Sequence, residues 1–311
     1  MYFPYLRAKQ FELIALRELV EYGLIGTKIF PIIEPVKFSS TLIKTIEQFS
    51  IEKKFIGVVR NPQVGNFINE IGNVNNDKSA EKLIELLRVQ TVLSSHITNE
   101  NSVFDLMKLI EQGINKNDII LIHNNRDYLS QYADTFHDTA ARYNLIPDES
   151  VYRRTVRHNR ILFNDKFAKK TRNTDYTEDE DEFFSDDHLY YEEDGYKGFS
   201  DYSIIGSDYN ETGFAPYAVA IHIVYFDTKK NLRIRHFVSD SNKDTKDPAG
   251  KFGEALLKLV EWNKAQNLNT YGIMQLISHF KKGTYPGLGT VKKLSLMHHF
   301  ELMSNFLEEV Q

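Results

Sequence analysis

The stretch IFPIIEPVKFSSTLIKTIEQF, residues 29–49, joins an apolar β-type run to a segment with helical periodicity, and Ser39 or Ser40 can cap that helix. Four more units of this kind lie in the first half of the chain. Their strands are predicted at residues 1–9, 55–62, 91–98 and 118–125. Five successive β-then-α units predict parallel strands joined by right-handed crossovers.

Two architectures fit such units, a doubly wound open sheet and a TIM-type (β/α) barrel. Polar side chains stand at or just past the predicted strand ends: Lys9, Glu34, Arg60, His96 and His123. A barrel gathers its site from many strand ends, whereas an open sheet concentrates it at one switch point, often after a glycine-rich turn. The first turn, LRAKQFE, contains no glycine. We therefore favour an α/β fold of the TIM-barrel type, regular or irregular.

The second half of the chain departs from this pattern. Two more barrel strands are predicted at 157–167 and 199–206, an antiparallel β-hairpin at 217–226 and 232–240, and terminal helices at 250–266, 270–280 and 290–310. An acid-dense segment, residues 174–196, is expected to be a flexible, solvated insertion. We expect one barrel-like domain over residues 1–311.

Composition excludes several classes of protein. The 311 residues are 41% hydrophobic and carry a formal net charge of -5, which does not support nucleic-acid binding. The chain has no cysteine, so disulfides, thiolate zinc sites and iron–sulfur clusters are excluded. No signal peptide or membrane span is expected, and a cytoplasmic location with no membrane association is the default.

A family resemblance comes from the opening YFPYLRAKQFELIALREL, residues 2–19, followed by FPIIEPV, residues 30–36. It resembles the start of the Beta protein family of bacterial and phage-encoded proteins. The matching positions are Pro4, Lys9, Glu12, Ala15, Leu16, Pro31 and Glu34. The later SDYSIIG and TVKKLSLMHH also look like family landmarks, but LIHNN at residues 121–125 lacks the Asp of the commoner family pattern.

This resemblance implies a TIM-barrel-like fold and no particular reaction. Genes of the family are found in mobile elements and beside defence genes, which implies a role in anti-phage defence or phage–host conflict.

Strand parity suggests a charged site. Glu34, Arg60 and His123 each follow two apolar residues at alternate positions of their strands. If these faces point into the barrel, the three side chains meet Lys9 at one mouth, and Asp201 can join them. Arg60 and Lys9 would bind an anion, Glu34 would orient them or act as a base, and His123 would transfer protons. The alternative is a structural layer of salt bridges.

A second anion-binding segment is GTYPGLGTVKK, residues 283–293. Gly289, Thr290 and Lys292 could hold a phosphate at a helix start, although the order of a P-loop is missing and a plain helix cap is the alternative.

No metal site is predicted, and the cofactor is left open. The adjacent His298 and His299 cannot chelate as an i, i+4 pair, and His222 and His236 are expected to form a surface pair across the hairpin.

Two hypotheses for function follow. In the first, the protein is an enzyme that uses the barrel mouth on a phosphate-bearing or nucleotide-like substrate. In the second, it is a non-catalytic recognition or assembly subunit that works with a separately encoded effector such as a nuclease, and residues 174–196 with the hairpin form the contact surface.

Overall fold

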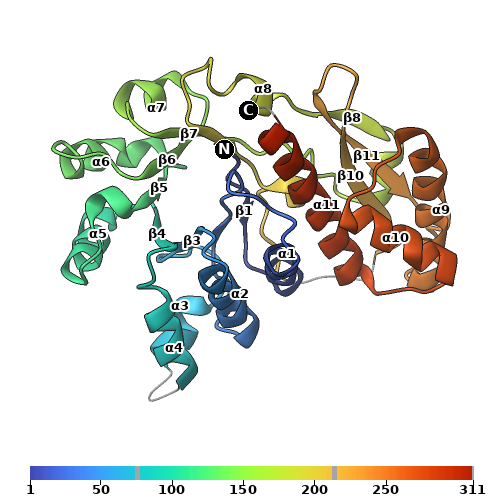
Figure 1. Cartoon of the computed structure of the whole chain (residues 1–311), viewed down its shortest axis with the longest axis horizontal. Helices are drawn as coiled ribbons and strands as arrows, with labels where there is room; N and C mark the ends of the chain where they lie inside the picture. Colours follow the sequence, from blue (N-terminus) through green and yellow to red (C-terminus); the bar gives the residue numbers. More distant parts are fainter. Residues whose placement is uncertain (74–77, 212–215, 310–311) are drawn as a thin grey trace.

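The computed structural model describes residues 1–73, 78–211 and 216–309 (Figure 1). Eight parallel strands form its main sheet. In spatial order they are β1 (Tyr5–Leu6), β2 (Ile32–Ile33), β3 (Ile56–Val59), β4 (Val92–Ile97), β5 (Ile120–Ile122), β6 (Tyr143–Ile146), β7 (Arg160–Phe163) and β9 (Gly198–Ser200). The N–H of Phe3 donates to the carbonyl of Phe199 at 2.8 Å, and that of Tyr5 to Asp201 at 2.9 Å. The last strand therefore lies beside the first, which confirms the predicted TIM-type barrel.

Helices follow most of these strands and cover the outside of the barrel. They are α1 (Gln10–Glu21), α2 (Ser40–Ile51), α3 (Phe67–Gly72), α4 (Lys78–Leu86), α5 (Ser102–Glu111), α6 (Leu129–Thr135) and α7 (Ser150–Thr155). The predicted cap of α2 is confirmed at Ser39, whose Oγ accepts from the N–H of Leu42 at 3.2 Å. Short 3-10 turns at Lys116–Asp118 and Arg126–Tyr128 flank β5.

Two apolar clusters separate the inside of the barrel from its outside. The inner cluster consists of Phe3, Tyr5, Phe30, Ile32, Val59, Leu93, Ile97, Ile120, Ile122, Leu145, Ile161 and Phe163. The alternate strand residues, such as Ile33, Val58 and Leu121, belong to the larger outer cluster that the helices cover. Both faces of the strands are apolar, as expected for a parallel sheet covered by helices.

One barrel strand, β6, was missed by sequence reasoning, which predicted no strand between those at 118–125 and 157–167. The structure ends α6 at Thr135 and starts β6 at Tyr143. The strand has only four residues, and periodicity cannot distinguish so short an apolar run from a helix end. The strands predicted sixth and seventh are therefore the seventh and eighth of the barrel.

A second, three-stranded antiparallel sheet lies to the side of the barrel (Figure 1). The predicted hairpin is confirmed as β10 (Ala220–Phe226) and β11 (Leu232–Val238), and its third strand is β8 (Asp181–Ser185). Two arginines of β11, Arg233 and Arg235, form ion pairs with Asp181 at 2.6 and 3.4 Å.

The acid-dense segment 174–196 thus supplies β8, and also most of a 3-10 turn, Asn173–Thr177, and the short helix α8 (Asp187–Tyr190). We expected a flexible insertion here from the sequence. The structure instead forms strand β8 in this segment, and the Asp181 of that strand pairs with two arginines of β11.

The three terminal helices are α9 (Pro248–Gln266), α10 (Tyr271–Lys282) and α11 (Leu288–Glu309), close to their predicted positions. Helix α11 packs against both α1 and β10, so it connects the barrel to the second sheet (Figure 1). Its adjacent histidines are buried: His298 Nε2 lies 2.7 Å from the carbonyl of Val224, and His299 Nδ1 lies 2.7 Å from Ser203 Oγ. Ser203 begins a 3-10 turn, Ser203–Ile205, just after β9.

Candidate functional site

Glu34 lies inside the barrel at the carboxyl end of β2 and is fully buried. The hydroxyl of Tyr5 donates to Glu34 Oε2 at 2.6 Å, the backbone N–H of Gln63 donates to Oε1 at 2.7 Å, and Arg7 forms an ion pair with the carboxylate. Both carboxylate oxygens therefore have donors, which makes burial of the charge tolerable.

Arg7, which sequence reasoning missed, is the counter-ion. Its guanidinium lies 5.4 Å from the ring centroids of both Tyr5 and Tyr202, and its Nη2 donates to the carbonyl of Ser207 at 3.0 Å. The sequence did contain a signal that could have identified Arg7. Phe3, Tyr5 and Arg7 stand at alternate positions of one strand and therefore share its inner face. This end of the barrel is filled by side chains that are paired with one another.

Arg60 and His123 do not join Glu34, so the predicted convergence at one mouth is wrong. Ile32 of β2 pairs with Gly57 of β3, and both face inward, which turns Arg60 outward. On β5 the inward residues are Ile120 and Ile122, so His123 also faces outward. Strands that are apolar on both faces carry no parity signal, and the inner face was therefore chosen wrongly on β3 and β5.

Outside the barrel, Arg60 lines a cavity of about 460 Å³ at the carboxyl ends of β3 and β4, together with Asn61, His96 and Lys108. Arg60 Nη1 donates to Ser94 Oγ at 3.1 Å.

His123 is instead buried among side chains. Its Nε2 lies 3.1 Å from Asn144 Oδ1, and its ring contacts Tyr132 edge to face. Burial lowers the pKa of His123 to about 4, so the ring is neutral at physiological pH. His123 is therefore a packed core residue.

Asp201 also lies on the outer side of the barrel, where α11 covers it. Its Oδ1 accepts from the hydroxyl of Tyr2 at 2.6 Å and from the N–H of Ser203 at 2.7 Å. Burial raises the pKa of Asp201 to about 6, although both hydrogen bonds act in the opposite direction. Asp201 therefore links Tyr2 to Ser203, both of which contact His299 of α11, and does not reach Glu34.

The predicted cationic residues Lys9 and Lys292 do meet, in a cavity of about 390 Å³ that we call the lysine cavity. Lys9 follows β1, Lys169 and Lys170 follow β7, and Lys292 lies in the first turns of α11. Residues after β9, from Ile204 to Asn210, complete the barrel side, and β10 forms the opposite wall. The cavity thus opens at the carboxyl ends of the seventh, eighth and first barrel strands, where barrel proteins place their ligands.

Lys9 has the least compensated charge of the four lysines. Lys169 lies 3.9 Å from Asp208, Lys170 lies 2.7 Å from Asp179, and Lys292 lies 3.1 Å from Glu12.

For Lys9, the described part of the chain supplies no ion pair. Its Nζ donates to the carbonyl of Asn210 at 2.6 Å and lies 4.9 Å from the ring centroid of Tyr209. Burial and the charges of Lys292 and Lys169 lower the pKa of Lys9, and the carboxylates of Glu12 and Glu211 offset only part of this effect. An anion bound here would relieve this repulsion.

Of the three residues predicted to hold phosphate at 289–292, only Lys292 lines the lysine cavity. A Cβ at Gly289 would overlap the ring of Phe11, so this glycine permits close packing of α11 on α1. Thr290 lies in the same turn of α11 but does not line the cavity.

A second hollow, of about 790 Å³, adjoins the lysine cavity: it shares Thr171, Asn173 and Pro216 with it and adds Arg172. The basic segment 169–172 borders both. Together, the two adjacent hollows have room for a ligand larger than a single phosphate.

His222 of β10 also lines the lysine cavity, and its partner His236 was predicted wrongly as part of a surface pair. The two residues are opposite each other in the hairpin, as expected, but His236 is buried. Its Nδ1 lies 2.6 Å from Nδ1 of His222, and its Nε2 lies 3.0 Å from Oε1 of Glu182.

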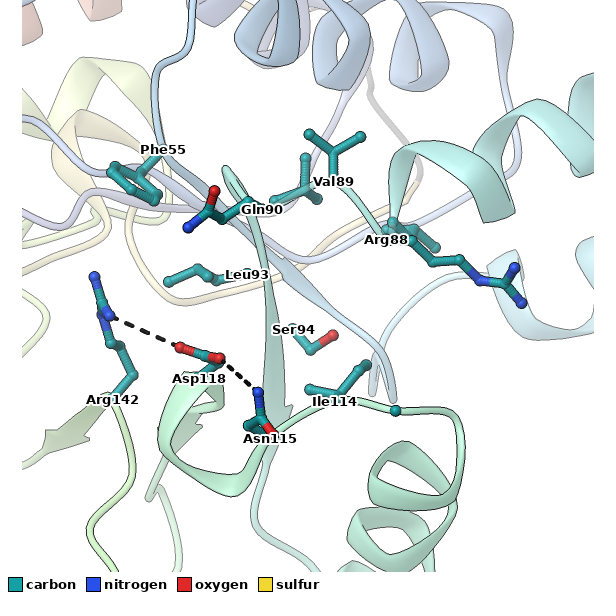
Figure 2. Close-up of a pocket in the computed structure, with 13 residues that line it drawn as sticks. Phe55, Arg88, Val89, Gln90, Leu93, Ser94, Ile114, Asn115, Asp118 and Arg142 are labelled. Atoms are coloured by element: carbon teal, nitrogen blue, oxygen red, sulfur yellow. Dashed lines mark hydrogen bonds and ion pairs between the residues drawn. The ribbon is translucent and has the colours of Figure 1, made fainter.

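A further cavity, of about 210 Å³, lies at the opposite end of the barrel near the amino ends of β4, β5 and β6. Figure 2 shows Asp118 between Arg142 and Asn115, which lie 3.8 and 3.4 Å from its carboxylate. Barrel proteins use this end for stability and not for ligands.

No cluster of three or more His, Asp or Glu side chains in the described ranges is arranged to hold a metal ion. Within the same ranges, no helix has the length and apolar character needed to cross a membrane.

Fold and site together define a TIM-type α/β barrel with an attached antiparallel sheet and a cationic cavity between them. No protein-family model, curated protein or solved structure matches the chain. The charges and position of the lysine cavity are therefore the features that indicate a ligand.

Proposed function

We propose that the protein binds a phosphate-bearing or nucleotide-like anion in the lysine cavity. The observation that carries this proposal is Lys9, a partly buried cation that has other lysines as neighbours and no ion pair in the described residues. The carboxylates of Glu12 and Glu211 offset part of this charge, and a bound anion would offset the rest. Oxygen atoms of a phosphate accept charge-assisted hydrogen bonds from lysine ammonium groups.

The position of the cavity supports the same ligand. Barrel proteins frequently bind phosphate with the loops after the seventh and eighth strands and the amino end of an additional helix. Here those loops follow β7 and β9, and the helix is α11. The adjoining hollow beside Arg172 gives room for a nucleoside attached to the phosphate.

The biological setting that we propose is bacterial anti-phage defence or phage–host conflict, in the cytoplasm. It is supported by the resemblance of residues 2–19 and 30–36 to the Beta protein family, which includes Lys9 of the cavity and Glu34 of the barrel interior.

The direct test is isothermal titration with inorganic phosphate and with adenosine 5′-monophosphate. We expect Lys9→Met to weaken binding about 10-fold or more, since a hydrogen bond to a charged group contributes about 1.5–3 kcal/mol. Lys293→Met is the control, because Lys293 is the neighbour of Lys292 in α11 but pairs with Glu18 of α1 and lies outside the cavity. Absence of binding by the wild type, or equal weakening by both variants, contradicts the proposal.

A non-catalytic recognition role with a separately encoded effector is the second candidate. It is favoured by exposed aromatic side chains in the segment 174–196: Phe183 on β8 is 53% exposed and Tyr190 of α8 is 47% exposed. Exposed aromatic residues are common anchors of protein interfaces. The double variant Phe183→Ser/Tyr190→Ser should then abolish co-purification with the effector while anion binding persists; retained co-purification would exclude these residues as the contact.

A further inference from the structure

A hydrogen-bonded chain of three side chains crosses the second sheet, with one member on each strand. Glu182 lies on β8, His236 on β11 and His222 on β10. The distances are 3.0 Å from Glu182 Oε1 to His236 Nε2 and 2.6 Å from His236 Nδ1 to His222 Nδ1. The chain begins at a partly exposed carboxylate and ends at the wall of the lysine cavity.

These contacts determine which ring nitrogens carry protons. A carboxylate can only accept, so Nε2 of His236 donates to Glu182. In neutral His236 the Nδ1 is then unprotonated and accepts the N–H of His222 Nδ1. Since a neutral imidazole has one N–H, Nε2 of His222 is left with a free lone pair. The tautomers of both histidines therefore follow from one contact, the hydrogen bond from His236 to the carboxylate of Glu182.

The surroundings of His222 keep it neutral and fixed. Its ring meets that of Tyr176 at 4.7 Å and that of Phe167 at 5.2 Å, both edge to face. Burial lowers the pKa of His222 to about 3, and the charges of His236 and Lys292 act in the same direction, so Nε2 takes up a proton only when a bound anion offsets these effects. A proton that arrives at Nε2 can leave from Nδ1 to His236, where the carboxylate of Glu182 stabilises the positive charge.

A purely structural pair would not require this arrangement. Two histidines that fill a sheet interior need partners for their N–H groups, but they have no reason to end at a cavity lined by lysines. Here the same residue is the last member of the chain and part of the cavity wall. A base that is oriented by a further hydrogen-bonded group is the arrangement used to activate nucleophiles, and here a second ring lies between the base and the carboxylate.

We propose that the protein hydrolyses phosphate esters bound in the lysine cavity, with His222 as the general base and His236 and Glu182 as positioning residues. This inference rests on the proposed anion binding. A water oxygen attacks phosphorus while His222 Nε2 takes one of the water's protons. The bond from phosphorus to the ester oxygen breaks, and its electron pair leaves with that oxygen. The hydroxyl stays on phosphorus, and the proton held by His222 balances the one that the leaving oxygen takes up.

The lysines have a separate task in this reaction. Lys9 and Lys292 face the bound phosphate and would stabilise the negative charge that develops on its oxygens. Removal of either lysine should therefore weaken both binding and turnover, whereas removal of His222 should affect turnover alone.

The test uses bis(4-nitrophenyl) phosphate and 4-nitrophenyl phosphate as probes and follows the release of nitrophenolate by the full chain. We expect His222→Gln to lower kcat/KM about 100-fold or more, the usual contribution of a general base, with phosphate binding by titration unchanged. Glu182→Gln should lower kcat and shift the pH profile while KM stays the same. His137→Gln, at an exposed loop position, is the control variant.

Nitrogen-15 NMR of histidine-labelled wild type provides a readout that needs no variant. We expect His222 to be protonated on Nδ1 and unprotonated on Nε2, with His236 protonated on Nε2. A proton on Nε2 of His222 would overturn the inference even if His222→Gln failed to fold.

The outcomes separate the two proposals. If phosphate binds but neither probe releases nitrophenolate, or if His222→Gln hydrolyses the probes as well as the wild type, the hydrolytic role is overturned and the binding site stands. If phosphate does not bind, the proposed function itself is overturned.

Discussion

Glu34 and Arg7 form an ion pair that is buried inside the barrel, with Tyr5 and the backbone of Gln63 as further donors to the carboxylate. Such a pair contributes little net stability compared with apolar residues of the same size, but each member depends strongly on the other. The geometry therefore indicates an architectural role for Glu34 at this end of the barrel.

Replacement of Glu34 by Gln should destabilise the fold by about 3–5 kcal/mol, because it leaves the guanidinium of Arg7 buried without a counter-ion. Chemical denaturation measures this change. The double variant Arg7→Met/Glu34→Leu should lose much less, since it removes both charges. Wild-type stability of Glu34→Gln would contradict an architectural role.

Asp201 gives a prediction that depends on pH. Burial raises its pKa from 3.8 to about 6. Between these two pH values, the folded state therefore holds a proton on this carboxyl group that the unfolded chain has released. The associated stability is present below about pH 4 and is lost as the pH rises through about 6.

Asp201→Asn cannot titrate, and its Oδ1 can still accept from Tyr2 and Ser203. The free energy of unfolding of the wild type should therefore fall relative to this variant by roughly 3 kcal/mol between about pH 3 and about pH 7, at about 1.4 kcal/mol per pKa unit. Denaturation curves at both pH values measure the difference. Asp194→Asn, at an exposed turn, is the control, and a difference that does not change with pH would disprove the assignment.

At the scale of elements, the repeated β-then-α units and the hairpin were predictable because long amphipathic helices and long alternating strands carry strong periodic signals. Strands β6 and β8 were not. Strand β6 has only four residues. Strand β8 lies in an acid-dense segment, and the sequence does not reveal that its Asp181 pairs with Arg233 and Arg235 of β11. Charge that is neutralised across a sheet cannot be distinguished from surface charge in the sequence.

Deletion of residues 174–196 should lower the thermal midpoint and make unfolding less cooperative, because β11 would lose its outer neighbour and expose an unpaired edge. Circular dichroism during heating measures both effects. The variant Glu193→Ser/Asp194→Ser removes acidic charge from the exposed turn after α8 and should leave the midpoint unchanged. An unchanged midpoint in the deletion would instead indicate that the segment is dispensable.

At the scale of the whole molecule, the lysine cavity lies where the barrel, α11 and the second sheet meet. Sequence reasoning identified Lys9 and Lys292 as anion-binding residues but assigned them to separate sites. They belong together only because α11, near the end of the chain, packs on α1, near its start. Neither spacing nor periodicity encodes such a contact, and for the same reason His222 was not connected with Lys9.

A ligand bound at this junction should stabilise the barrel and the second sheet together. We expect phosphate at about 100 times its Kd to stabilise the protein by about 2.7 kcal/mol and to raise Tm in a single transition. Differential scanning calorimetry measures this, with buffer free of phosphate and sulfate as the reference. Lys293→Met should keep the increase and Lys9→Met should lose most of it; an increase that both variants retain would place the ligand elsewhere.

Closure of the barrel has a consequence for how the chain folds. The segment that completes the cylinder, β1, precedes the other barrel strands in the chain, and it binds to β9, as in the hydrogen bond from Ser200 Oγ to the carbonyl of Phe3, 197 positions apart. During synthesis β1 can pair early with β2, but its other edge stays unpaired until β9 has been made. Contacts of such long sequence separation form slowly. The rate-limiting step of folding is therefore expected to be the docking of β1 on β9, and the open half-barrel before it is the state most exposed to aggregation and proteolysis.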